Sequence, residues 1–387
     1  MLALPLLTER THFRGAIYAT YAAMQLGAQL MIEFARIHSD AYQATQHSNK
    51  AGTSGMANAP PVEVDRTGQT KSAPASVLQF LHKVWAEGHP AYTEAEALSC
   101  ARRVGAVSFG QVVQLNPDSS VVVTAFSSGS SIGGANWLVE AYGARFSLLA
   151  EPAAPAPTLK TTASQISASK ELDLAEPLHG ADVLLLRSVR PRGVSTPTNA
   201  LVKILAEVST CVGRGGSVLF PCSPCAGVTP GLIQALATEL KLRLLPPSLT
   251  VPIVLLSPIG SEGLAHVSSL GEWLDEPRGA RAFLPEMPFD FDEMVADGRL
   301  VCAPSASELA APLPEPCIVF ASDPSLRAGE AARLLDEWRQ PFHGREALLV
   351  LTSRTDDCEV SRIGCIVVDP LGLPPHLLQL CVARCGS

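Results

Sequence analysis

The feature that most restricts the fold is an alternation of two apolar patterns along the second half of the chain. Short runs of Val, Ile and Leu bounded by Gly, Pro or Ser are typical of buried strands. Segments with apolar residues three and four positions apart are typical of amphipathic helices. After residue 180 the strand pattern and the helix pattern alternate. This alternation predicts an α/β protein with a mostly parallel sheet covered by helices.

The patterns give expected positions for most elements. Strands are expected at 15–19, 120–126, 145–149, 182–186, 217–221, 252–257, 317–321, 347–351 and 365–368. Helical spacing occurs at 24–34, 201–208, 232–240 and 331–338. Thr93 and Glu96 have the spacing of a capping box, and Thr229 with Pro230 is typical of an N-cap followed by a first-turn proline.

Two stretches without apolar periodicity divide the chain. Residues 39–74, rich in Ser, Thr, Gln, Ala, Gly and Pro, predict a flexible surface insertion. Residues 151–170 predict a linker. The expected organisation is a lobe over 1–150 that contains the insertion, the linker, a second lobe over 171–368, and a tail at 369–387 of uncertain order.

Composition limits the classes of function. The net charge of -8, with 29 Lys and Arg against 37 Asp and Glu, excludes binding to nucleic acid by bulk positive charge. An aromatic content of 5% disfavours a protein built on base-stacking platforms. The longest apolar stretch, 242–259, is interrupted by prolines and is not expected to span a membrane. We therefore expect a folded protein without a membrane partner, whose contact with RNA, if any, is local.

Ser131 lies in the segment Gly129 to Gly133, which matches the G-x-S-x-G nucleophile elbow and follows a predicted strand. In a serine hydrolase Ser131 would be the nucleophile. The elbow requires a helix directly afterwards, yet 135–142 fits a strand equally well. A turn of small residues is the alternative interpretation. A hydrolase would also need an acid and a later histidine, for which the chain offers His266, His343 and His376.

Cys222 and Cys225 have the spacing of a redox dithiol or of half a zinc site. No second pair lies at a suitable distance, and Cys211 is the nearest other thiol. We interpret them as structural cysteines at the exit of a strand. The nine histidines include no His-x-His and no pair four residues apart, which disfavours a site for metal-assisted hydrolysis.

A basic cluster of Arg187, Arg190 and Arg192 follows the strand expected at 182–186. Binding sites on open sheets lie at this end of the strands. The cluster could contact an RNA phosphate, and a solvated loop with scattered arginines is the alternative.

Several segments resemble, in order, the metallo-β-lactamase/β-CASP family of nucleases. They are 2–5 and 11–20, then 127–129 with Gly133, Asn136 and Trp137, then 215–222, 256–259, 272–274 and 320–327. The resemblance implies the C-terminal part of a metallo-β-lactamase-like sandwich up to about residue 150, followed by a β-CASP-like parallel-sheet domain. It also implies a fragment, because the first metal motifs would precede Met1 and a C-terminal pairing domain would follow Ser387.

The residues at the matching positions imply a non-catalytic member of the family. Active members carry a metal-binding histidine where this chain has Ser130, a bridging aspartate where it has Glu151, and an acid where it has Arg187. A neutral hydroxyl and a cation are poor substitutes in a dinuclear zinc site. We therefore expect no catalytic residue, no metal and no cofactor. The rival hypothesis is an active metal-dependent RNA endonuclease whose ligands lie further upstream.

The resemblance further implies a partner and a location. A non-catalytic member of this kind would form a heterodimer with a catalytic β-CASP endonuclease inside a larger nuclear complex. That complex would act in the 3′-end processing of small nuclear RNAs and in the termination of RNA polymerase II transcripts.

Overall fold

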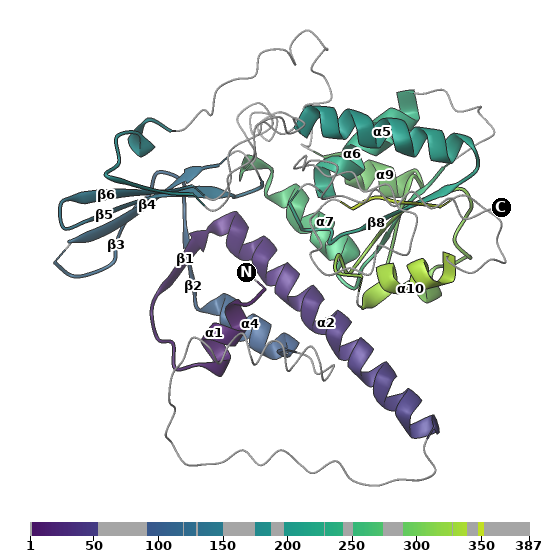
Figure 1. Cartoon of the computed structure of the whole chain (residues 1–387), viewed down its shortest axis with the longest axis horizontal. Coiled ribbons are helices and arrows are strands. Elements are labelled where there is room, and N and C mark those ends of the chain that lie inside the picture. The colour runs from purple at the N-terminus through teal and green to yellow at the C-terminus, as the bar shows by residue number, and fades with distance from the viewer. Residues whose placement is uncertain are drawn as a thin grey trace, which may run out of the picture.

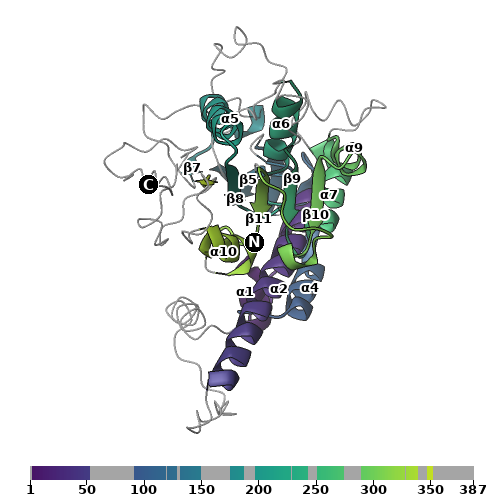
Figure 2. The same cartoon turned by 90° about the vertical axis from the view of Figure 1, so that its right-hand side faces the viewer.

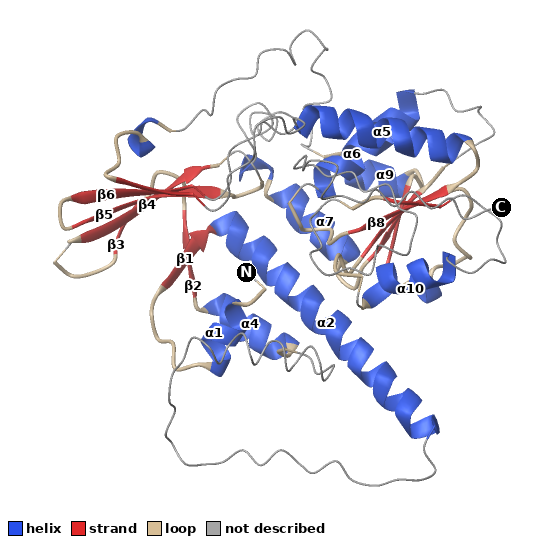
Figure 3. Cartoon of the chain, viewed as in Figure 1, coloured by secondary structure: helices blue, strands red, loops and turns tan. Residues whose placement is uncertain are grey.

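The structure, a computed structural model, confirms the α/β class with one parallel and one mixed five-stranded sheet (Figures 1 and 3). It describes residues 2–52, 91–118, 120–128, 131–149, 175–186, 197–227, 229–242, 251–273, 289–326, 328–338 and 347–351.

The N-terminal elements surround one long helix. They are α1 (Leu4–Arg10), β1 (Ile17–Thr20), α2 (Tyr21–Gly52), α4 (Glu94–Arg102) and β2 (Val104–Val107). Strands β1 and β2 form a small parallel pair, and α4 contacts both α1 and α2. The capping box expected at the start of α4 is confirmed: Glu96 N donates to Thr93 Oγ1 at 3.3 Å, and Thr93 N donates to Glu96 Oε2 at 2.8 Å.

The mixed sheet has the order β3-β4-β5-β6-β7. Its strands are β3 (Val112–Gln114), β4 (Val121–Ser127), β5 (Ala135–Ala141), β6 (Ala144–Leu149) and β7 (Val183–Leu186). Neighbours are antiparallel except for β6 and β7, which are parallel. The short helix η1 (Glu176–Leu178) precedes β7, and all four residues of β7 are exposed.

The parallel sheet has the order β10-β9-β11-β8-β12, with every neighbouring pair parallel. Its strands are β8 (Ser217–Pro221), β9 (Ile253–Leu256), β10 (Leu300–Ala303), β11 (Ile318–Ala321) and β12 (Ala347–Leu349). The accompanying helices are α5 (Pro197–Gly213), α6 (Thr229–Leu242), α7 (Gly260–Ser269), η2 (Gly271–Trp273), α9 (Phe291–Ala296), η4 (Ala306–Glu308) and α10 (Gly329–Trp338). Figure 2 shows α5 and α6 on one side of the sheet and α10 on the other.

Successive residues of the parallel strands enter two different cores. Phe220 and Phe320 stack at 4.7 Å in the core that contains α5 and α6, whereas Leu219 and Val319 enter the core that contains α10. Both faces of the sheet are buried, so its central strands need apolar side chains at every position. This explains why they appear in the sequence as uninterrupted apolar runs.

Helix α2 joins the two parts of the molecule. It contacts α4, β1 and β2 on one side and α7 and α10 on the other (Figure 1). Met31 and Ala35 are 1% and 2% exposed and belong to the same core as the parallel sheet.

The sequence prediction is wrong for the start of the insertion. Helix α2 continues to Gly52, so 39–52 is helical rather than irregular. This stretch contains several Ala and Gln residues, which favour helix even without an apolar period. The rest of the insertion, the linker, the expected strand at 365–368 and the tail lie outside the described residues.

Candidate functional site

The carboxyl ends of three parallel strands meet at one edge of the sheet. Pro221, Leu256 and Ala321 end β8, β9 and β11 and lie side by side in the strand register. Buried serines follow these strands directly or after one residue, namely Ser223, Ser257 and Ser322. Ligand sites on open parallel sheets lie at this edge, so these serines lie where a binding site would be expected.

Helix α2 places Glu33 against this edge. The hydroxyls of Ser257 and Ser322 each donate a hydrogen bond of 2.5 Å to Glu33 Oε1. Glu33 is only 3% exposed. The Ser223 hydroxyl faces the same carboxyl group without a well-formed hydrogen bond of its own.

Burial raises the pKa of Glu33 above its ordinary value, because a carboxylate is poorly solvated in the interior. The three serine hydroxyls act in the opposite direction, and the nearby negative charge of Asp323 raises the pKa further. The interior therefore stabilises the neutral form of Glu33 relative to a glutamic acid in water.

His38 and Asp323 lie next to this cluster. Asp323 accepts a hydrogen bond of 3.2 Å from Ser325 N and a second from the Ser325 hydroxyl. Burial lowers the pKa of His38, and the charge of Asp323 opposes that shift. The His38 ring packs on Phe34 with ring centres 4.1 Å apart, so it acts mainly as a neutral packing group.

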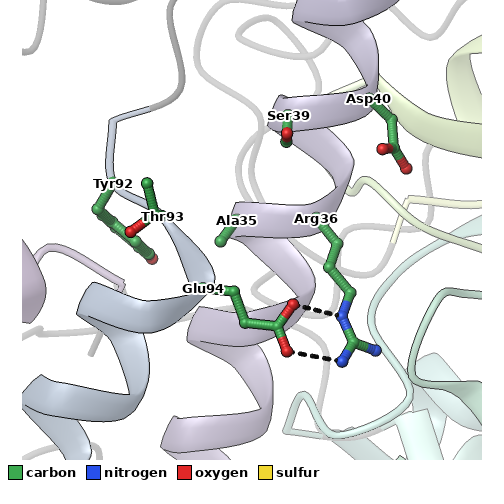
Figure 4. A pocket seen from close by; sticks show the side chains of 7 residues that line it. All are labelled: Ala35, Arg36, Ser39, Asp40, Tyr92, Thr93 and Glu94. Atoms are coloured by element: carbon green, nitrogen blue, oxygen red, sulfur yellow. Dashed lines mark hydrogen bonds and ion pairs between the residues drawn. The ribbon is translucent and has the colours of Figure 1, made fainter.

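A second polar feature lies one turn further along α2. A pocket of about 250 Å³ lies between α2 and α4. Figure 4 shows the side chains that line it, among which Arg36 and Glu94 are joined by two hydrogen bonds. Arg36 Nη1 also donates to the carbonyl of Pro258 at 3.1 Å. The Arg36 guanidinium holds the pKa of Glu94 below its ordinary value. The Arg36 side chain thus connects α2 with α4 and with the loop after β9.

Ser131 lies in an exposed turn, and strand β5 follows that turn where a nucleophile elbow requires a helix. Gly133 packs against the first turn of α2: an added Cβ would lie 2.5 Å from Ala22 Cβ and 2.8 Å from Ala23 N. Thr20 Oγ1 donates to the Gly133 carbonyl at 2.6 Å. The glycine is needed for this close approach, which favours the small-residue turn over the elbow. His266 lies in the last turn of α7, and His343 and His376 lie outside the described residues.

Cys222 and Cys225 are each 4% exposed and are not joined by a disulfide. Burial raises the pKa of Cys222 to about 12 and also raises that of Cys225. Cys211 is buried elsewhere, near the Ser217 carbonyl. A protonated, inaccessible thiol is a poor nucleophile and metal ligand, so the geometry supports the structural interpretation.

Comparison with curated proteins gives matches along most of the chain. Integrator complex subunit 9 homolog from Nematostella vectensis is 28% identical over 342 residues, and Integrator complex subunit 9 from Homo sapiens is 27% identical, each across 87% of this chain. The chain resembles Integrator complex subunit 9. A homolog from Dictyostelium discoideum is 25% identical across 95% of the chain. No protein-family model matches.

The chain spans about half the length of these relatives, between 46% of the first two and 50% of the third. The positions at which an Integrator subunit 9-like chain would differ from a nuclease, Ser130, Glu151 and Arg187, lie outside the described residues, as do Arg190 and Arg192. Within the described ranges, no three His, Cys, Asp or Glu side chains are placed to hold a metal ion. None of the described helices has the length and apolar character to span a membrane.

Sequence reasoning missed Glu33, although a signal was present. Glu33 is the one acid within the apolar helical pattern at 24–34. A carboxyl group on the buried side of a helix must find partners. Those partners follow strands more than 200 residues further on, so the spacing could not identify them.

Proposed function

We propose that this protein is a non-catalytic scaffold subunit of the Integrator complex. In this role it pairs with a catalytic β-CASP endonuclease in small nuclear RNA 3′-end processing and in the termination of RNA polymerase II transcripts. The observation that carries the proposal is the similarity to Integrator complex subunit 9 over 87% of the chain. A nuclear location follows from membership in such a complex.

The geometry of the parallel sheet supports a structural role. In open α/β sheets the carboxyl edge is where ligands bind, but here α2 covers it. Glu33, Ser257 and Ser322 are each at most 3% exposed, and both serine hydroxyls donate to Glu33. These three side chains therefore stabilise the packing of α2 on the sheet and are not presented to a substrate.

The first prediction tests the partner. A tagged copy purified from its own cells at mild salt should recover a catalytic β-CASP subunit, and RNA cleavage should accompany that partner. The tagged chain expressed alone serves as the control and should cleave no RNA. A clean monomer from the native cells would contradict the proposal.

The hydrolase alternative has its own control. A fluorophosphonate probe should label the wild-type chain no more than the Ser131→Ala variant, because Ser131 lacks the strand-turn-helix setting that activates a nucleophile. Labelling that disappears in Ser131→Ala would restore the hydrolase hypothesis.

A further inference from the structure

Helix α2 is fastened to the parallel sheet at two points one turn apart. Glu33 contacts the serines that follow β9 and β11, and Arg36 contacts the carbonyl of Pro258 in the loop after β9. Arg36 also holds α4 through Glu94. The position of the N-terminal elements relative to the sheet therefore depends on a short segment of one helix.

The two fastenings differ in solvent exposure. The side chains of Arg36 and Glu94 are 35% and 42% exposed, so water and salt screen their attraction and the pair contributes little. Glu33 is almost completely buried. Its two short hydrogen bonds form in a medium of low polarity, where each bond contributes more to stability and its loss costs more than at the surface.

The surroundings of Glu33 suit a neutral acid better than an anion. The loop after β8 contributes Ser223 and the thiols of Cys222 and Cys225, whose own pKa values the Glu33 charge would raise. The loop after β11 contributes Ser322 and the like-charged Asp323. Ser257 follows β9, and on α2 itself His38 is held near its neutral form by burial. The negative charge of Asp323 opposes ionisation of the Glu33 carboxyl group.

We propose that the contact of Glu33 with Ser257 and Ser322 is a latch that holds α2 on the carboxyl edge of the parallel sheet, and that loss of the Glu33 proton releases it. In the closed state the carboxyl group is buried and protonated. When α2 lifts, the carboxyl group enters water and ionises. Release of α2 would expose the carboxyl edge of the sheet. Helix α4, which is bound to α2, would move away from the sheet together with α2.

The direction of the pH effect follows from proton linkage. The closed state binds the Glu33 proton more tightly than the open state, because burial raises the pKa of this group. Closure is therefore fully stabilised below the ordinary glutamate pKa of 4.5 and weakens as the pH rises toward the closed-state pKa. Within that window one proton is released on opening, so the opening equilibrium should increase about tenfold per pH unit.

The test is amide hydrogen exchange of the full chain, measured across pH and corrected for the intrinsic pH dependence of exchange. In wild-type protein, the opening equilibrium of α2 and α7 should rise with pH as described. Glu33→Gln keeps the shape and an acceptor for both serines but cannot ionise, so its opening equilibrium should be flat. Ser257→Ala removes the hydrogen bond to Glu33 and the one that the Ser257 hydroxyl accepts from Ile259 N, but keeps the carboxyl group, so it should open more at every pH and keep the pH dependence.

The same pH dependence in Glu33→Gln as in wild type would overturn the proposal, as would a flat wild-type profile. Infrared spectroscopy provides a measurement that needs no variant to fold. Wild-type protein should show a protonated buried carboxylic acid whose signal disappears over the pH range in which α2 opens. Absence of that signal at acidic and neutral pH would also overturn the proposal.

Discussion

At the scale of single residues, two glycines show how the space around a backbone position determines the effect of a substitution. Gly133 has a φ of +68° and lies against the backbone of α2. Gly143 has a φ of +82° with nothing within 4 Å of an added Cβ. The two positions share a left-handed backbone and differ in the space around it.

This contrast gives the second prediction. Gly143→Ala should lower the free energy of unfolding by about 1 to 2 kcal/mol, the cost of a left-handed conformation for alanine. Gly133→Ala should lower it by about 3 kcal/mol or more, because overpacking against Ala22 and Ala23 adds to that strain. Denaturant unfolding of both variants measures the difference. Equal losses would show that the turn does not pack tightly on α2.

At the scale of elements, short-range sequence signals predicted where two helices begin. The capping box at Thr93 and Glu96 is confirmed, and α6 begins at Thr229, one residue earlier than an N-cap role for Thr229 implies. These signals work because the partners lie within three residues of each other. Strands β2, β3 and β10 were missed. They have only three or four residues each and lie at sheet edges or in the two-stranded sheet, although the apolar run Leu300–Ala303 is a signal that could have identified β10.

The third prediction concerns the cap of α4. Thr93→Ala removes the hydroxyl that accepts from Glu96 N and should lower the free energy of unfolding by about 1 kcal/mol. Thr93→Ser keeps the hydroxyl and should remain within a few tenths of a kcal/mol of wild type. Denaturant unfolding compares the three proteins. A loss in the serine variant as large as in the alanine variant would assign the effect to the threonine methyl group instead.

At the scale of the whole molecule, the sequence predicted the class of the fold. It did not predict how α2 packs on the parallel sheet. Alternating strands and helices predict the parallel sheet because each element carries its own period. The placement of α2 across that sheet depends on contacts between Glu33 and residues 224 and 289 positions later. No local period encodes such a contact.

The fourth prediction concerns β7, an edge strand of the mixed sheet. Its four residues are 39%, 54%, 51% and 48% exposed, from Val183 to Leu186. An exposed apolar edge strand promotes association between chains. Leu185→Lys should therefore reduce the associated fraction of the isolated chain in light scattering.

The matched control for β7 is Val202→Lys on α5. Val202 is 58% exposed, but its backbone is already hydrogen-bonded within a helix. Isolated apolar residues on a surface are ordinary, so this variant should associate as much as wild type. An equal decrease in both variants would attribute the effect to net charge alone.

The long separation between α2 and its partners also affects how the chain is made. Glu33 leaves the ribosome 289 residues before Ser322, an interval of roughly 15 to 60 s at ordinary rates of translation. During that time Met31, Ile32 and Ala35, which the finished protein buries, have no sheet to cover them. The nascent chain thus carries an uncovered apolar helix face until the strands of the parallel sheet have been synthesised, which favours the binding of chaperones that act during translation.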